Sequence, residues 1–131
     1  MFRVSRSTVT ELSRELRGLP RDFLHYTLVD AQLVVGPTGV FVIVEAPDDP
    51  VEATYTAVDR AERLRHELSD RLAWVPFVDA VVVTADGAAP PTAECVVVAV
   101  DMIHDMIANG PRIIDAQTMM QLALLDLPRT D

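Results

Sequence analysis

Five consecutive apolar residues, from Val40 to Val44, constrain the fold of this chain more than any other feature. The side chains of a β-strand point alternately to the two faces of a sheet, so a strand without polar positions is covered on both faces. The Gly36-Pro37-Thr38-Gly39 segment before this run has the composition of a tight turn. We therefore expect a central strand in a sheet that carries helices on both faces.

The apolar spacing in the rest of the chain predicts the other elements of such a sheet. Helical periodicity predicts helices at about residues 9–17, 51–72, 101–108 and 115–125. β-branched and aromatic runs predict strands at about residues 23–29, 31–35, 40–45, 76–83 and 95–100. The resulting order, α-β-β-β-α-β-β-α-α, predicts an α/β fold with one domain over residues 1–131.

The charge balance excludes several classes of function. The chain has 20 acidic residues and 11 basic ones, all of them arginine, and its formal net charge is −9. An acidic surface disfavours strong binding to nucleic acid or to an anionic membrane. The absence of lysine excludes chemistry that needs a lysine amine. Because no apolar run could span a bilayer, no secretory signal is visible and Cys95 is a lone cysteine, we expect a cytoplasmic protein.

The segment from Asp30 to Ile43 reads D-A-Q-L-V-V-G-P-T-G-V-F-V-I. It resembles the strand-turn-strand signature of the nuclease-related domain, NERD, a branch of the restriction-endonuclease-like superfamily that reads roughly I-D-H-x-V-V-G-P-x-G-V-F-V-I-E-x-K. The resemblance implies a restriction-endonuclease-like αβββαβ core with a mixed sheet, here with an extra strand and two C-terminal helices. It also implies that an Asp at the Asp30 position and a Glu at the end of the next strand hold a divalent metal, while a Lys two residues beyond that Glu positions the hydrolytic water.

Two of these three catalytic positions are degenerate in this chain. Asp30 is retained, but Val44 stands at the Glu position and Ala46 at the Lys position. The resemblance therefore implies a catalytically inactive nuclease-like domain, or pseudoenzyme, without catalytic residues, bound metal or other cofactor. Its expected role is that of a structural or protein-interaction module that binds a protein partner or self-associates into a homo-oligomer. Whether the chain is an enzyme stays open, and absence of activity is favoured.

The alternative is a divalent-metal-dependent nuclease or phosphodiesterase with a migrated site. Asp30 and Glu45 would then bind Mg²⁺ or Mn²⁺, and Gln32 or Arg60 would have to replace the lysine. Alternation along the strand turns Glu45 away from the face of Val44, so this site needs a β-bulge. The favoured interpretation of Asp30 is a turn or strand-entry residue whose side chain caps backbone amides. The loop residues Asp48 and Asp49 are weaker metal candidates.

Two further patterns have competing interpretations. Asp101, His104 and Asp105 have a spacing that could present ligands to a metal, but this face of the predicted helix is also its solvent side. The carboxyl ends of strands 76–83 and 95–100 could form a nucleotide or small-ligand crevice, although no glycine fingerprint supports it. The directions of the side chains at Asp30, Val44 and Glu45 separate the inactive domain from the migrated site.

Overall fold

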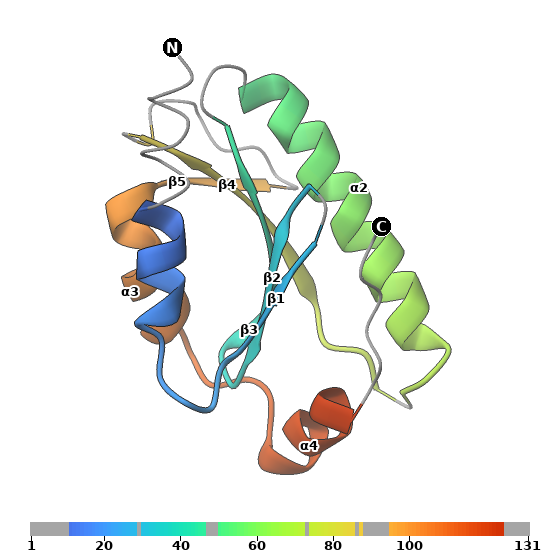
Figure 1. Cartoon of the computed structure of the whole chain (residues 1–131). Coiled ribbons are helices and arrows are strands. Elements are labelled where there is room, and N and C mark those ends of the chain that lie inside the picture. Colours follow the sequence, from blue (N-terminus) through green and yellow to red (C-terminus); the bar gives the residue numbers. More distant parts are fainter. Residues whose placement is uncertain are drawn as a thin grey trace.

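The computed structural model describes residues 11–28, 30–46, 50–72, 74–85, 87 and 95–124. They form an α/β fold around a five-stranded sheet (Figure 1). A helical segment at residues 11–17 comes first. The elements that follow are β1 (Leu24–Thr27), β2 (Gln32–Gly36), β3 (Gly39–Glu45), α2 (Pro50–Ser69), β4 (Val78–Thr84), β5 (Cys95–Ala99), the 3₁₀ turn η1 (Val100–Met102), α3 (Ile103–Ala108) and α4 (Ala116–Leu124).

The sheet is mixed, and its strands lie in the order of the sequence, β1-β2-β3-β4-β5. The pairs β1–β2 and β2–β3 are antiparallel, whereas β3–β4 and β4–β5 are parallel. Because parallel neighbours need a crossover, α2 crosses the sheet to join the end of β3 to the start of β4. The predicted α/β class is confirmed, and the expected central strand β3 is buried from Gly39 to Val44.

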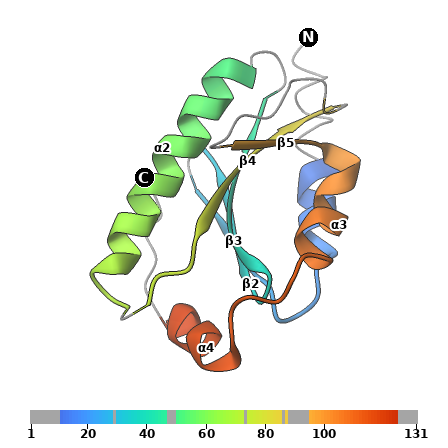
Figure 2. The ribbon, with the colours of Figure 1, turned by 180° about the vertical axis from the view of Figure 1, so that it is seen from behind.

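Helices cover both faces of the sheet, as the composition of β3 requires (Figure 2). We call the two sides the α2 face and the α3 face. The cluster of buried side chains on the α2 face includes Val44, Ala57, Leu68, Val82 and Leu122. The cluster on the α3 face joins the helix at residues 11–17 to α3 and includes Leu12, Ile43, Val83, Ile103 and Ile107.

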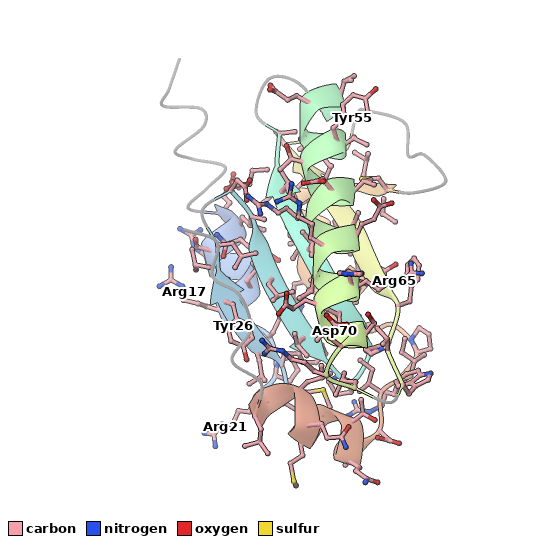
Figure 3. The ribbon with its side chains drawn as sticks, turned by 90° about the vertical axis from the view of Figure 1, so that its right-hand side faces the viewer. Arg17, Arg21, Tyr26, Tyr55, Arg65 and Asp70 are labelled. Atoms are coloured by element: carbon pink, nitrogen blue, oxygen red, sulfur yellow. The ribbon has the colours of Figure 1, made fainter. Side chains whose placement is uncertain are left out.

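The long helix α2 buries one narrow stripe and exposes the rest of its surface. Its buried residues are Ala53, Ala57, Ala61, Leu64 and Leu68, at the spacing of three and four that places side chains on one helix face. The small alanines allow close approach to β3 and β4. Figure 3 shows α2 lying along the sheet, with Tyr55 in its N-terminal half and Asp70 just beyond its last turn. None of the described helices is long and apolar enough to cross a membrane.

The turn between β2 and β3 is buried and anchors other elements. Gly36 pairs with Gly39, whose φ of +149° favours glycine. The Thr38 hydroxyl is buried and donates a 2.6 Å hydrogen bond to the Ile107 carbonyl at the end of α3. The Pro37 carbonyl accepts hydrogen bonds from the amides of residues 113 and 114, at 2.8 and 3.0 Å. The motif that carries the resemblance therefore holds the segment between α3 and α4 against the sheet.

Candidate functional site

Asp30 lies in the turn between β1 and β2, where its carboxylate binds an arginine of α2. The Arg60 Nε donates to Asp30 Oδ1 at 3.1 Å, and the Arg60 Nη2 donates to Asp30 Oδ2 at 3.0 Å. The Arg60 side chain is 22% exposed and the Asp30 side chain 38% exposed, so the pair sits at the rim of the α2 face. The planar guanidinium matches the carboxylate with two parallel hydrogen bonds.

This pairing determines what Asp30 can do chemically. The guanidinium carries a permanent positive charge and contacts both carboxylate oxygens. A divalent cation bound in the same place would have to displace Arg60 or bind beside its charge. Among the described residues, the Asp30 carboxylate caps no backbone amide, and both of its oxygens face the guanidinium instead of a metal.

Val44 and Ala46, at the positions that the resemblance assigns to Glu and Lys, lie inside the α2 face. Val44 is 7% exposed and Ala46 is 5% exposed, and both belong to the cluster under α2. Val44 lies beside Val82 in the parallel β3–β4 pair. The Ala46 amide continues the ladder with a 2.9 Å hydrogen bond to the Val83 carbonyl. Only apolar side chains therefore stand where a metal ligand and a water-positioning amine would be needed.

Glu45 points to the α3 face. Its partner in the register is Val83, which belongs to the α3-face cluster, and the β3–β4 pairing runs without interruption from Val40 to Glu45. The Glu45 Oε2 is buried and has no hydrogen-bond partner among the described residues. Burial raises the pKa of this carboxyl above its ordinary value, because desolvation disfavours the charged form. The structure therefore places Asp30 and Glu45 on opposite faces of the sheet.

The two residues considered as substitutes for a lysine have different surroundings. Gln32 accepts hydrogen bonds at its Oε1 from His25 Nε2, at 2.6 Å, and from Thr27 Oγ1, at 3.3 Å. Its neighbour in the register is Ile43, so Gln32 lies on the α3 face. Arg60 does approach Asp30, but as an ion-pair partner. Neither residue is arranged to steer a water molecule toward a metal held by Asp30.

The other metal candidates do not assemble into a site within the described residues. Asp48 and Asp49 lie outside them. Asp101 and Asp105 are exposed, as expected for the solvent side of a helix. His104 is only partly exposed, and its Nε2 lies 3.1 Å from the Gly18 carbonyl, so it links α3 to the end of the first helix. Across the described ranges, no group of three or more His, Cys, Asp or Glu side chains could hold a metal ion.

One acidic residue that the sequence did not single out, Asp79, lies in a largely buried strand. Asp79 is the only charged residue of β4, and its register partner Phe41 belongs to the α3-face cluster. Burial raises the pKa of the Asp79 carboxyl. Burial therefore raises the pKa of two separate carboxyls on the α3 face, Glu45 and Asp79, which lie at opposite ends of the β3–β4 pair. The signal for Asp79 was a single charge inside an otherwise apolar strand.

On the surface of the described residues, neither the pocket beside α2 nor the groove beside α4 is a large substrate cleft lined by Asp30. A 230 Å³ pocket between α2 and β2 includes Arg60, Arg63, Leu33 and Val42. Its volume is below the roughly 300 Å³ at which small-molecule sites begin. A larger groove of 710 Å³ lies beside α4, where it is lined by Arg112, Ile113, Met119 and Met120.

Comparisons with models of protein families, with curated proteins and with solved structures found no match. The local chemistry is therefore the basis for function. On the α2 face, a carboxylate is held by an arginine beside buried apolar residues. On the α3 face, Glu45 and Asp79 are partly buried carboxylates in separate places.

Proposed function

We propose that this chain is a catalytically inactive nuclease-like domain, similar to NERD domains, which acts as a structural or protein-interaction module. The main support is the environment of the three positions that the family pattern assigns to catalysis. Asp30 is engaged by Arg60, while Val44 and Ala46 bury methyl groups at the two other positions that the family pattern assigns to catalysis. The described residues around Asp30 can maintain packing, but none of them joins Asp30 in a group that could hold a cation.

The arrangement of the elements supports a restriction-endonuclease-like core. A helix precedes three antiparallel strands, and α2 then leads to β4, which lies parallel to β3. This order is consistent with the αβββαβ core implied by the motif. On this interpretation β5, α3 and α4 are additions to the core, and β5 extends the sheet beyond β4.

The chemistry of phosphodiester hydrolysis also favours an inactive domain. Metal-dependent nucleases need a cation that activates water and stabilises the charge that develops on the phosphate. A single Asp neutralised by an arginine does not supply the carboxylate set that holds such a cation. The formal net charge of −9 further opposes approach of a polyanionic substrate. These properties favour a protein partner over nucleic acid, and the lone Cys95 is compatible with the reducing cytoplasm.

The migrated-site alternative lacks a supporting observation. A cation shared by Asp30 and Glu45 needs both carboxylates on one face, and the regular register of β3 turns Glu45 to the α3 face. A cation site shared by Asp30 and Glu45 would require a β-bulge that turns the Glu45 side chain to the α2 face. It would also require Arg60 to leave Asp30. We therefore propose neither bound Mg²⁺ nor bound Mn²⁺.

A nuclease assay tests this proposal. The purified chain and Asp30→Ala are incubated with single-stranded and double-stranded DNA and with RNA, in the presence of Mg²⁺ or Mn²⁺. The expected result is no cleavage above the background that Asp30→Ala gives under the same conditions. Circular dichroism and a thermal melt establish that the variant is folded. Metal-dependent cleavage by the wild type that disappears in folded Asp30→Ala would contradict the proposal.

A further inference from the structure

The two edges of the sheet differ in how they are protected. Edge strands expose unpaired amides and carbonyls that can pair with another chain, and proteins usually blunt them with charges, proline or short length. β1 has only four residues, of which His25 and Thr27 are polar and exposed. β5 has the sequence C-V-V-V-A and contains neither a charge nor a proline. Within the described residues, only β4 pairs with β5, so its outer edge is free of a strand partner.

Apolar side chains flank the β5 edge on both faces of the sheet. Val96 lies on the α3 face and is 42% exposed, although it belongs to a strand made only of apolar residues. Val98 lies on the same face and packs against the α3-face cluster. Val97 lies on the α2 face, where it is partly buried. A strand added at this edge would cover Val96 and satisfy the outward backbone groups of β5.

The sequence of β5 is complementary to itself. If two copies pair antiparallel about a two-fold axis at Val97, Val97 faces Val97 of the second copy. Val96 then faces Val98, and Cys95 faces Ala99. Directly opposed residues lie on the same face of an antiparallel pair. The exposed Val96 therefore meets a β-branched side chain, and no like charges are opposed.

We propose that β5 is a self-association edge, through which a second copy of this chain pairs antiparallel to form one continuous sheet across the dimer. This inference names the partner of the interaction module and rests on that part of the proposed function. A two-fold contact of this kind is closed, because it uses the same strand of both copies. The remaining edges would be the two β1 strands, whose exposed polar residues oppose further growth.

Charge favours a second copy at β5 over contacts elsewhere on the surface. Two copies that each carry a formal charge of −9 repel one another, and this repulsion is least where the touching surfaces are uncharged. β5 is such a surface. The amides and carbonyls along its outer edge can form hydrogen bonds with an added extended strand. The α4 groove also exposes apolar residues, including Met120 at 66%, but it does not specify what would cover it. It therefore serves as the control surface.

The first test measures the oligomeric state by sedimentation equilibrium over a range of protein concentrations. The wild type is expected to form a dimer with a dissociation constant in the micromolar range, because a short edge makes a small interface. Val96→Lys is expected to weaken dimerisation at least tenfold, since lysine at an edge strand opposes pairing. Met120→Lys adds the same charge at the α4 groove and is expected to leave the dimer intact. Circular dichroism checks the fold of both variants.

The second test measures the register. Val97→Cys places a thiol next to its own copy across the two-fold axis, within the Cα separation that a disulfide accepts. Oxidation is expected to give a covalent dimer in most of this variant. Val96→Cys is the matched control, because residue 96 faces residue 98 of the other copy and should cross-link much less. The natural Cys95 is buried, and burial raises the pKa of its thiol. Cys95 should therefore contribute little to disulfide cross-linking between the copies.

The outcomes separate this inference from the proposed function. A wild type that stays monomeric at the highest concentration would overturn the β5 edge, and so would a dimer that survives Val96→Lys but dissociates with Met120→Lys. Preferential cross-linking through Val96→Cys would also overturn the proposed register. None of these results bears on nuclease activity. Conversely, a β5 dimer that cleaves DNA would keep the self-association edge and overturn the claim of inactivity.

Discussion

The two faces of the sheet hold their carboxylates in opposite ways. On the α2 face, Asp30 sits at the rim with a guanidinium against both of its oxygens. On the α3 face, Glu45 is partly buried and its Oε2 has no partner among the described residues. The residue next to Glu45 in β3, Val44, is buried under α2. A one-residue difference in position thus decides whether a carboxylate could have joined Asp30.

An acidic residue near a motif is therefore not evidence for a site until the face of the sheet on which it lies is known. Glu45 is close to the expected Glu position in sequence, but strand alternation places it on the α3 face, on the opposite side of the sheet from Asp30. Asp30 is on the right side, but its charge is already balanced.

The largest effect is expected from placing a carboxylate at residue 44. Val44→Glu should lower the free energy of unfolding by about 3 kcal/mol, because it buries a charge among packed apolar side chains. The mirror substitution on the other face, Glu45→Val, should leave stability unchanged or raise it slightly. Urea denaturation measures both. If Val44→Glu were as stable as the wild type, the α2 face could accept a metal-binding carboxylate and the account of this face would be wrong.

A smaller effect is expected from neutralising the carboxylate on the α3 face. The folded-state pKa of Glu45 is raised above its ordinary value of 4.5 by burial. The wild type therefore keeps its full stability below the unfolded pKa and loses part of it as the pH rises through the folded pKa. Glu45→Gln removes this loss, so its gain in stability over the wild type should grow from acid to neutral pH.

Urea denaturation of both proteins across this pH range measures the effect. Asp79→Asn is the matched variant on the same face, because burial raises the pKa of that carboxyl too. It should show the same direction of change. A gain for Glu45→Gln that is constant across the pH range would contradict the burial of this carboxylate.

The smallest effect is expected from the ion pair at the α2-face rim. A double-mutant cycle of Asp30→Ala and Arg60→Ala should give a coupling energy of about 0.5–1 kcal/mol, which decreases as salt is added. The exposed pair of Asp59 and Arg63 on α2, whose atoms lie 3.1 Å apart, is a control that should couple more weakly. Zero coupling between Asp30 and Arg60 would mean that Arg60 does not hold Asp30 in solution.

Local patterns in the sequence predicted much of the fold. The apolar run of β3 indicated its central position, and the alternation along it indicated that Val44 and Glu45 point to opposite faces. Both inferences depend only on the geometry of one strand. The expected helix at residues 101–108 instead begins with the 3₁₀ turn η1, whose first residues lack a side-chain cap.

The contacts between distant elements could not be predicted in this way. Asp30 and Arg60 are 30 positions apart, and their pairing depends on the angle and rotation of α2 over the sheet. The same holds for Thr38 and Ile107, and for His104 and Gly18. The sequence suggested Arg60 only as a substitute for a lysine, because periodicity shows which side of a helix is polar but not which residue it faces.

The proposal that no divalent cation binds at Asp30 is tested most directly by titrating the chain with Mn²⁺. The readout is the paramagnetic broadening of the backbone amide resonances. If Arg60 occupies Asp30, amides near these two residues should broaden no more than those near other exposed acidic residues such as Asp70, and Asp30→Ala should leave the pattern unchanged. Saturable broadening centred on Asp30 that disappears in Asp30→Ala would contradict the proposed inactivity, because the α2 face would then hold a divalent cation despite Arg60.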